Sequence, residues 1–209
     1  MRGVLLRDCR IIVVVNNFQI YLASKSPRRR QLLEQIGVRF ELVDADVDES
    51  AFPIEAPQEF VLTLARAKVM AANEHLTSEN LPLKPVLGAD TCVVIDDEIL
   101  GKPNNKGEAI RMLTRLSGTT HSVYTGVALY HDGKMNTQIS HSSVTFAVLQ
   151  SEQIEQYWAS SEPTDKAGAY AIQGRAATFI TQMNGSYSGV VGLPLYETTQ
   201  LLAAAGVEI

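Results

Sequence analysis

The chain has 209 residues, of which 45% are hydrophobic and 20% charged, and its formal net charge is −5. This length suits one large α/β domain or two small lobes with a cleft between them. The acidic balance argues against broad nucleic-acid binding, so nucleic acid is not an expected partner. Its two cysteines, Cys9 and Cys92, are too few for a disulfide framework. No apolar run approaches the roughly 20 residues that cross a bilayer, so we expect a cytoplasmic protein without a membrane partner.

The first 17 residues form a segment of their own. A basic stretch is followed by a brief apolar run at 11–15, which is too short for a signal peptide and has no small-residue cleavage site after it. We expect 1–17 to be an extension without a role in the chemistry, and 18–209 to form a single domain. The alternative is that the natural start lies nearer Asn16.

The remaining chain alternates between strand and helix patterns without repeats. The pattern favours a mixed sheet with flanking helices, because helices and hairpins are interleaved. We expect strands at 19–23 and 38–43, at 85–95 and 98–100 with a turn at 96–97, at 120–149 with a turn at 132–133, and at 169–173 and 177–183. We expect helices from 27 to a stop at Gly37, and at 57–73, 106–116, 151–160 and 194–205.

Basic and hydroxyl side chains gather where the first helix begins, in the segment Ser24-Lys25-Ser26-Pro27-Arg28-Arg29-Arg30. Ser26 is expected to be the N-cap residue and Pro27 the first helical residue. Cations are unfavourable at a helix N-terminus, whereas an anion is favoured there. Two hydroxyls and up to three guanidinium groups therefore predict a phosphate-binding site, although a solvated basic first turn is the simpler alternative.

Two charged residues stand at positions that otherwise read as buried. Lys68 falls within the apolar face of the 57–73 helix, so its ammonium either extends outward to solvent or points into a site that matches its charge. Asp90 interrupts an apolar strand, where a carboxylate needs a partner or a metal. Gly88 just before it permits a close backbone approach, as ligand sites often require. A satisfied structural role for Asp90 remains the alternative.

Other candidates for chemistry are weaker. Asp44, Asp46, Asp48 and Glu49 form an acidic loop that lacks the spacing of a Ca²⁺ loop, although one or two of them could bind Mg²⁺. Lys102 places a second lysine after a strand. Cys92 has no histidine nearby in sequence and is expected to be a core residue. The four histidines show no zinc-site spacing, and the glycine-rich turn at 185–194 is neither a Walker loop nor a dinucleotide motif. Arginines and lysines that oppose carboxylates are suited to phosphoryl chemistry on a polyphosphate.

These motifs, taken in order from Gln19 to the C-terminus, resemble those of the Maf family of nucleoside triphosphate pyrophosphatases. The resemblance rests on 22–29 (LASKSPRR), Asp48-Glu49, 64–68 (LARAK), 88–91 (GADT), 101–103 (GKP), 166–174 (KAGAYAIQG) and 185–194. It implies an α/β fold with two lobes around a deep cleft, similar to inosine triphosphate pyrophosphatases. It also implies hydrolysis between the α- and β-phosphates, which gives a nucleoside monophosphate and pyrophosphate, with Mg²⁺ or Mn²⁺ as cofactor. Homodimerisation is a further family expectation.

The resemblance also assigns roles to individual residues. Asp90 would be the catalytic carboxylate that activates water and, with Glu49, binds the metal. The phosphate chain would be held by Ser24, Ser26, Arg28 and Arg29, and charge on the phosphates would be neutralised by Lys68 and Lys102. One departure from the family pattern is Thr63, where arginine is common.

Three positions indicate the substrate. The branch that hydrolyses dTTP and UTP is similar to this chain in having Arg28, Thr91 and Gln173, whereas the branch that acts on 7-methyl-GTP has tryptophan, glutamine and glutamate there. A glutamine amide donates and accepts at once, which matches the imide edge of thymine or uracil. We therefore expect a dTTP/UTP pyrophosphatase. The alternatives are a 7-methyl-GTP pyrophosphatase, a phosphatase that removes the terminal phosphate, and a non-enzymatic nucleotide-binding regulator of cell division.

Overall fold

The computed structural model describes residues 18–52 and 56–209. The expected extension at 1–17 lies outside the described residues, so the expected domain boundary stays a prediction. The fold is a seven-stranded mixed sheet with the strand order β2-β1-β3-β5-β6-β7, and with β4 paired to β3. Strands β1 and β2 and strands β1 and β3 pair in parallel, and the other pairs are antiparallel. The expected mixed α/β class is thus confirmed.

The strands occupy Ile20–Leu22 (β1), Phe40–Leu42 (β2), Val86–Ile95 (β3), Glu98–Leu100 (β4), Thr120–His131 (β5), Lys134–Phe146 (β6) and Ile180–Asn184 (β7). The helices occupy Pro27–Gln35 (α1), Pro57–Ser78 (α2), Lys106–Leu116 (α3), Ser151–Ala159 (α4), Tyr187–Val191 (α5) and Leu195–Ala204 (α6). Short 3₁₀ helices cover Glu49–Ala51 (η1), Glu162–Asp165 (η2), Ala167–Ala169 (η3) and Arg175–Phe179 (η4).

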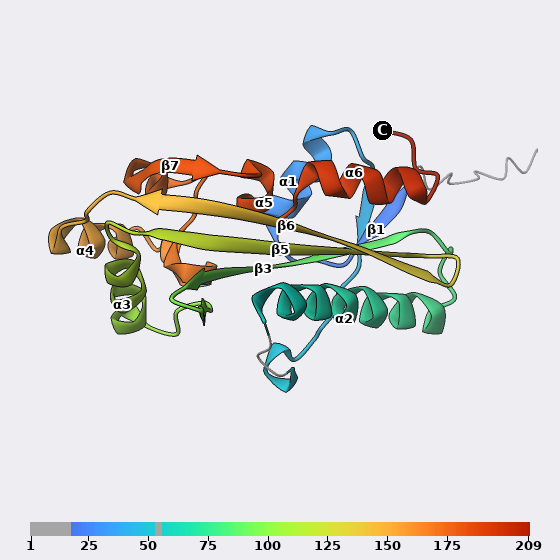
Figure 1. The fold of residues 1–209 in the computed structure, drawn as a ribbon. Helices are drawn as coiled ribbons and strands as arrows, with labels where there is room; N and C mark the ends of the chain where they lie inside the picture. The colour runs from blue at the N-terminus through green and yellow to red at the C-terminus, as the bar shows by residue number, and fades with distance from the viewer. Residues whose placement is uncertain (1–17, 53–55) are drawn as a thin grey trace, which may run out of the picture.

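The helices pack on both faces of the sheet and at one of its ends (Figure 1). Helix α2 lies along one face, against β3 and β5, and α1, α5 and α6 lie on the opposite face. Helices α3 and α4 gather at the far end of the long strands, where they enclose a hydrophobic cluster of their own that includes Leu113, Phe146 and Ile154. Separate clusters beneath α1 and α6 and beneath α2 fill the other end, so the cores correspond to the two expected lobes.

Strand alternation determines which face each side chain of β1 and β3 meets. Ile20 and Leu22 pack in the cluster beneath α1 and α6, whereas Tyr21 packs in the cluster beneath α2. Along β3, Gly88 faces α2. A Cβ atom at Gly88 would lie 2.7 Å from Val69 Cγ2 and 3.3 Å from the Ala65 carbonyl oxygen. The close approach that Gly88 permits is therefore that of a helix and not, as expected, that of a ligand.

Both predicted hairpin turns are confirmed. Asp96 and Asp97 have φ values of 51° and 60° between β3 and β4, and Asp132 and Gly133 have φ values of 47° and 76° between β5 and β6. Two consecutive residues with positive φ match the twist of the flanking strands, and aspartate and glycine adopt this conformation at low cost. The turn residues therefore fix the register of both hairpins.

The predicted strand at 169–173 is wrong, and the predicted strand at 177–183 is wrong in its first part. Residues 167–169 form η3, in which Gly168 and Ala169 have φ values of 67° and 60°, and this left-handed backbone cannot continue as a strand. Residues 175–179 form η4, so β7 begins only at Ile180. Two smaller differences are that α2 runs five residues beyond the expected end at 73, and that the glycine-rich segment contains the short helix α5.

Candidate active site

A pocket of about 640 Å³ opens between the start of α1, the middle of β3 and the segment 165–173. Its walls come from both lobes, with Ala23 from the core beneath α2 and Tyr170 and Ile172 from the core beneath α3 and α4, so it corresponds to the cleft expected between the lobes. All ten residues to which the resemblance gives a part in catalysis, binding or substrate choice line this pocket: Ser24, Ser26, Arg28, Arg29, Glu49, Lys68, Asp90, Thr91, Lys102 and Gln173. Residues up to 149 positions apart (173 − 24) in the chain are thus brought together at one place.

The start of α1 contributes two of its three arginines. Arg29 donates hydrogen bonds from Nε to the Gly192 carbonyl oxygen (2.7 Å), from Nη1 to Ser24 Oγ (3.2 Å) and from Nη2 to Thr91 Oγ1 (3.4 Å). Arg28 lies 3.8 Å from Asp165 Oδ2 across the pocket. Arg30 is not among the pocket-lining residues, so the site holds two guanidinium groups from this segment, not three.

Ser26 occupies the N-cap position as predicted, with extended backbone, and Pro27 is the first helical residue. Its hydroxyl makes no capping hydrogen bond to the described helix. Instead, the Ser26 backbone N–H donates to Ser24 Oγ over 3.2 Å. The α1 N-terminus therefore faces the pocket without a side-chain cap, and an anion is favoured there by the helix dipole.

Lys68 points into the pocket and not outward to solvent. Its Nζ lies 2.6 Å from Asp90 Oδ1 and 2.8 Å from Glu49 Oε1. The Lys68 side chain is 13% exposed and Asp90 is 7% exposed, whereas Glu49 reaches in from η1 and is half-exposed. One ammonium thus joins a buried strand carboxylate to a carboxylate from the acidic loop.

The two carboxylates differ in acidity. Burial raises the pKa of Asp90, an effect that the charges of Lys68 and Arg29 offset only in part. Burial also opposes the charging of Glu49, but the hydrogen bond and charge of Lys68, with the charges of Lys102 and Arg29, lower the pKa of Glu49 overall. Asp90 is therefore the better proton acceptor of the pair, and Glu49 the more permanent anion.

The donor set fits a divalent cation that is bound together with a phosphate ligand. Asp90 and Glu49 converge on a single point, which Lys68 Nζ occupies, and both offer the hard oxygen donors that Mg²⁺ prefers. Among the described residues no group of three or more His, Cys, Asp or Glu side chains is placed to hold a metal. One or two carboxylates completed by substrate phosphates is the usual arrangement for Mg²⁺.

A chain of hydrogen bonds with a fixed direction runs from Arg29 beneath the pocket. The Thr125 hydroxyl donates to the Gly189 carbonyl oxygen over 2.8 Å, so it accepts from Thr91 Oγ1, which lies 2.9 Å away. Thr91 Oγ1 in turn accepts from Arg29 Nη2. The Thr91 hydroxyl oxygen therefore accepts a hydrogen bond from Arg29, and its proton is donated to Thr125, away from the pocket.

Gln173 and Lys102 also line the pocket, and both are exposed. Neither side chain hydrogen-bonds to another residue in the part of the chain that the structure describes. Their polar groups are therefore accessible to a ligand in the pocket. Cys92 is buried as expected, and burial together with the nearby Asp90 charge raises its pKa to about 12, which leaves the thiol protonated.

Sequence reasoning missed several residues of the site. Asp165 and Lys166 line the pocket and form an ion pair, and Asp165 also faces Arg28. Lys166 belongs to the 166–174 motif, but nothing in the sequence indicates that its side chain points into the pocket. Thr125 supports Thr91 because the β3–β5 register pairs the two residues directly, although they lie 34 residues apart in the sequence. Only the strand pairing reveals that relation.

The fold and the site define a mixed α/β protein with a pocket for a polyanion and a buried carboxylate beside it. The chain belongs to the Maf family: residues 19–205 match the family described as "Maf-like protein". It is 54% identical over 184 residues to the dTTP/UTP pyrophosphatase of Alkalilimnicola ehrlichii, covering 88% of this chain and 91% of the relative. It is 50% identical to the proteins of the same name from Nitrosomonas europaea, with 91% and 96% covered, and from Albidiferax ferrireducens, with 91% and 98% covered.

Proposed function

We propose that this protein hydrolyses dTTP and UTP between the α- and β-phosphates, giving the nucleoside monophosphate and pyrophosphate. The names of relatives that are about 50% identical over most of the chain support the activity and the substrates. The observation that carries the proposal is the meeting of Asp90 and Glu49 at Lys68, below the Arg29 side chain at the α1 N-terminus. Such a site offers an acceptor for a proton and cations for the phosphates.

The role of each residue in the reaction follows from its charge. Arg28, Arg29, Ser24 and the α1 N-terminus hold the phosphate chain. Asp90 takes a proton from the water that attacks the α-phosphorus, while the bond from the α-phosphorus to the bridging oxygen breaks and pyrophosphate leaves. Lys68 and Lys102 offset the negative charge that develops on the phosphate oxygens.

A divalent cation, Mg²⁺ or Mn²⁺, would be held by Glu49 and Asp90. When bound, it supplies positive charge to the phosphates and favours deprotonation of water. Because the two carboxylates also bind Lys68, the lysine and the cation share the same anionic partners. Substrate phosphates would complete the ligand set, as is usual for Mg²⁺.

Gln173, Thr91 and Arg28 would select the base. The Gln173 amide can donate to one carbonyl and accept from the imide N–H of thymine or uracil. Thr91 contributes indirectly, because its hydroxyl supports Arg29. Arg28 stands at the pocket edge opposite Asp165. A pyrimidine base therefore meets one amide with both a donor and an acceptor.

Product analysis tests this proposal. Purified protein with Mg²⁺ or Mn²⁺ is incubated with dTTP, UTP, CTP, GTP and 7-methyl-GTP, beside Asp90→Asn and Asp132→Asn as a matched control in the exposed β5–β6 turn. We expect monophosphate and pyrophosphate from dTTP and UTP, a loss of at least about 10²-fold in Asp90→Asn, and none in Asp132→Asn. Orthophosphate as the first product would contradict the reaction, and turnover of 7-methyl-GTP alone would contradict the substrate. Binding without turnover would favour a regulator.

We also propose a cytoplasmic location and a homodimer, as the family resemblance implies. In the described ranges no helix has the length and apolar character to span a membrane. Light scattering on the purified protein tests the dimer: a mass near 22.9 kDa would contradict it, and twice that mass would support it. Cell fractionation tests the location.

A further inference from the structure

The segment 171–176 carries Gln173 into the pocket, but Gln173 does not anchor it. The Gln173 side chain is exposed and lacks a hydrogen bond to any described residue. Ala171 and Ala176 on either side are buried. Two turn hydrogen bonds involve the segment, from the Gly174 N–H to the Ala171 carbonyl oxygen and from the Ala177 N–H to the Gly174 carbonyl oxygen, and neither involves Gln173. Whatever fixes the Gln173 amide must therefore act through the neighbouring backbone.

Two side chains outside the segment bind that backbone on both sides of Gln173. On the N-terminal side, the Ala171 N–H donates to Tyr157 Oη over 3.1 Å. On the C-terminal side, the Arg175 N–H donates to Glu162 Oε2 over 3.0 Å and the Ala176 N–H to Glu162 Oε1 over 3.4 Å. The two side chains are joined, because Tyr157 Oη donates to Glu162 Oε1 over 2.7 Å. Together they form a clamp, here defined as Tyr157 and Glu162.

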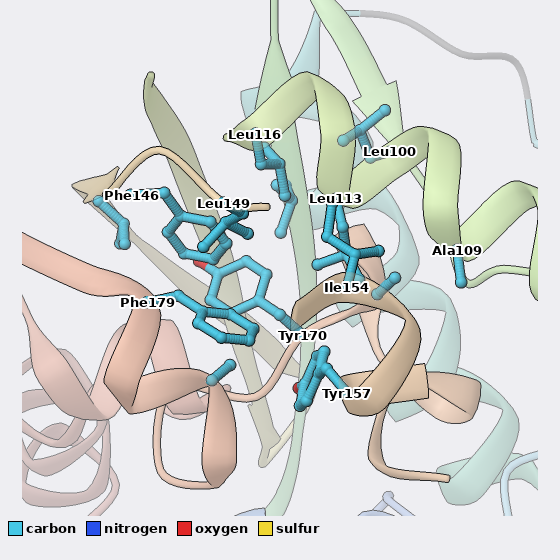
Figure 2. Packing of buried hydrophobic residues seen from close by; sticks show 14 of the residues in the cluster. Leu100, Ala109, Leu113, Leu116, Phe146, Leu149, Ile154, Tyr157, Tyr170 and Phe179 are labelled. Atoms are coloured by element: carbon cyan, nitrogen blue, oxygen red, sulfur yellow. The ribbon is translucent and has the colours of Figure 1, made fainter. Parts of the chain in front are cut away.

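Tyr157 is held by the hydrophobic core of its lobe, and Glu162 is held as a charged acceptor. Tyr157 lies on α4, is 3% exposed, and its ring meets the Phe179 ring edge-on with centroids 5.1 Å apart (Figure 2). Although burial opposes its charging, the N–H donors of Arg175 and Ala176 and the Tyr157 hydroxyl lower the pKa of Glu162, so it remains a carboxylate. Hydrogen bonds to a charged acceptor are stronger than those to a neutral one.

Gly174 shows how closely the segment sits on the carboxylate. A Cβ atom at Gly174 would lie 2.4 Å from the Glu162 carboxylate carbon and from both of its oxygens. Such a distance is far inside van der Waals contact, so any larger residue at position 174 would displace the Glu162 carboxylate from its place against the segment. The backbone next to Gln173 is therefore in direct contact with the clamp.

We infer that Tyr157 and Glu162 are positioning residues for substrate selection: they hold the backbone on both sides of Gln173 so that its amide meets the base. The inference rests on the proposed function for its substrate. Neither residue lines the pocket, and neither touches the phosphate site. Loss of the clamp is therefore expected to loosen base recognition and to leave the phosphate chemistry in place.

The test compares Tyr157→Phe, Glu162→Gln and Glu162→Ala with wild type. Tyr21→Phe is the matched control, since Tyr21 is a buried tyrosine in a different cluster. We expect Tyr157→Phe and Glu162→Ala to raise KM for dTTP about tenfold, to lower the preference for dTTP over CTP to a similar degree, and to change kcat by less than about threefold. Glu162→Gln keeps one acceptor and should fall between wild type and Glu162→Ala.

A double-mutant cycle with Gln173→Ala identifies the route of the effect. If the clamp acts through Gln173, Tyr157→Phe leaves the dTTP/CTP preference of the Gln173→Ala enzyme unchanged. An equal loss of preference in both backgrounds would overturn the inference, as would wild-type KM and preference in Tyr157→Phe and Glu162→Ala. A purely structural role would lower stability in urea without a change in preference, which also contradicts it.

The clamp can be tested even if the proposed function fails. If wild-type protein hydrolyses no nucleotide, binding of the non-hydrolysable analogue with a methylene bridge between the α- and β-phosphates of dTTP replaces KM in the comparison. Hydrogen exchange of the Ala171, Arg175 and Ala176 amides adds a readout without substrate. We expect faster exchange in Tyr157→Phe and Glu162→Ala than in Tyr21→Phe. Equal exchange together with equal analogue affinity would overturn the clamp.

Discussion

The Lys68 ammonium lies 2.6 Å from Asp90 Oδ1, although the two residues belong to different elements, α2 and β3. Gly88, two residues before Asp90, lets α2 approach β3 closely enough for this pairing. The same ammonium meets Glu49, so it separates two like charges that would otherwise repel each other. The packing of one helix on one strand thereby sets the electrostatics of the pocket.

Replacement of Lys68 by methionine keeps most of the side-chain volume and removes the charge. We expect kcat to fall by about 10²- to 10³-fold, because the ammonium no longer offsets charge on the phosphates and Asp90 becomes harder to ionise. Steady-state kinetics with dTTP measure this loss. Lys106→Met at the exposed start of α3 is the matched control and should retain wild-type kinetics. Retention of more than a third of the activity in Lys68→Met would contradict the assigned role.

Thr125 supports the pocket without lining it. Thr125→Val leaves the buried Gly189 carbonyl without its donor and Thr91 without its acceptor. We expect the free energy of unfolding in urea to fall by about 1–3 kcal/mol, and KM to rise because Arg29 loses part of its support. Thr77→Val, where the hydroxyl donates to the exposed Asn73 carbonyl, is the control and should cost less than about 0.5 kcal/mol. Equal losses in the two variants would contradict the directed chain.

Much of this arrangement could be predicted from the sequence where local chemistry decides the outcome. The positive-φ turns at 96–97 and 132–133 follow from their aspartate and glycine residues. The α1 start follows from Ser26 and Pro27. Lys68 and Asp90 were identified as charges on apolar faces, and the structure now shows that they satisfy each other. The family resemblance added Glu49, which no local pattern separates from Asp44, Asp46 and Asp48.

The remainder depends on contacts between distant segments. The residues at 169–173 read as a strand because their apolar side chains are buried, but they pack as 3₁₀ turns and coil on Tyr157 and Glu162. Apolar runs of this length do not distinguish strands from other buried segments. Likewise, the partner of Gly88 is Val69 and not a ligand, and nothing within 86–95 indicates which element approaches it.

Gly88→Ala tests whether α2 must lie close to β3. The added methyl group would lie 2.7 Å from Val69 Cγ2, so α2 is displaced at a cost of about 1–3 kcal/mol in the free energy of unfolding. We expect kcat to fall as well, because Lys68 adjoins Val69. Val69→Ala in the Gly88→Ala background removes the obstructing methyl group and should restore kcat, although not full stability.

Gly126→Ala provides the contrast to that rescue. There the new Cβ would meet the Val61 backbone carbonyl at 2.8 Å, which no side-chain substitution can relieve. We therefore expect Val61→Ala to leave the Gly126→Ala defect uncorrected in thermal unfolding and in kinetics.

For the Gly88 prediction, failure of Val69→Ala to restore the kcat of the Gly88→Ala enzyme would show that the position of α2 does not control Lys68.

We expect stability at mildly acid pH to depend on His121. Its Nε2 lies 2.8 Å from Tyr170 Oη and its ring meets Phe146 edge-on in the core, and burial lowers the pKa of His121 from 6.5 to about 4. The His121 imidazole is therefore protonated below about pH 6.5 in the unfolded chain, but only below about pH 4 in the folded chain. The free energy of unfolding should fall as the pH drops through that window, by at most about 3 kcal/mol.

Urea unfolding at pH 7.5 and pH 4.5 measures this contribution. His121→Gln removes the titrating group, so the difference in unfolding free energy between the two pH values should be smaller than in wild type by about 2 kcal/mol. His75→Gln, an exposed histidine near the end of α2, serves as the control and should keep the wild-type difference. A difference in His121→Gln as large as that in wild type would show that other groups, and not the buried imidazole, govern acid unfolding.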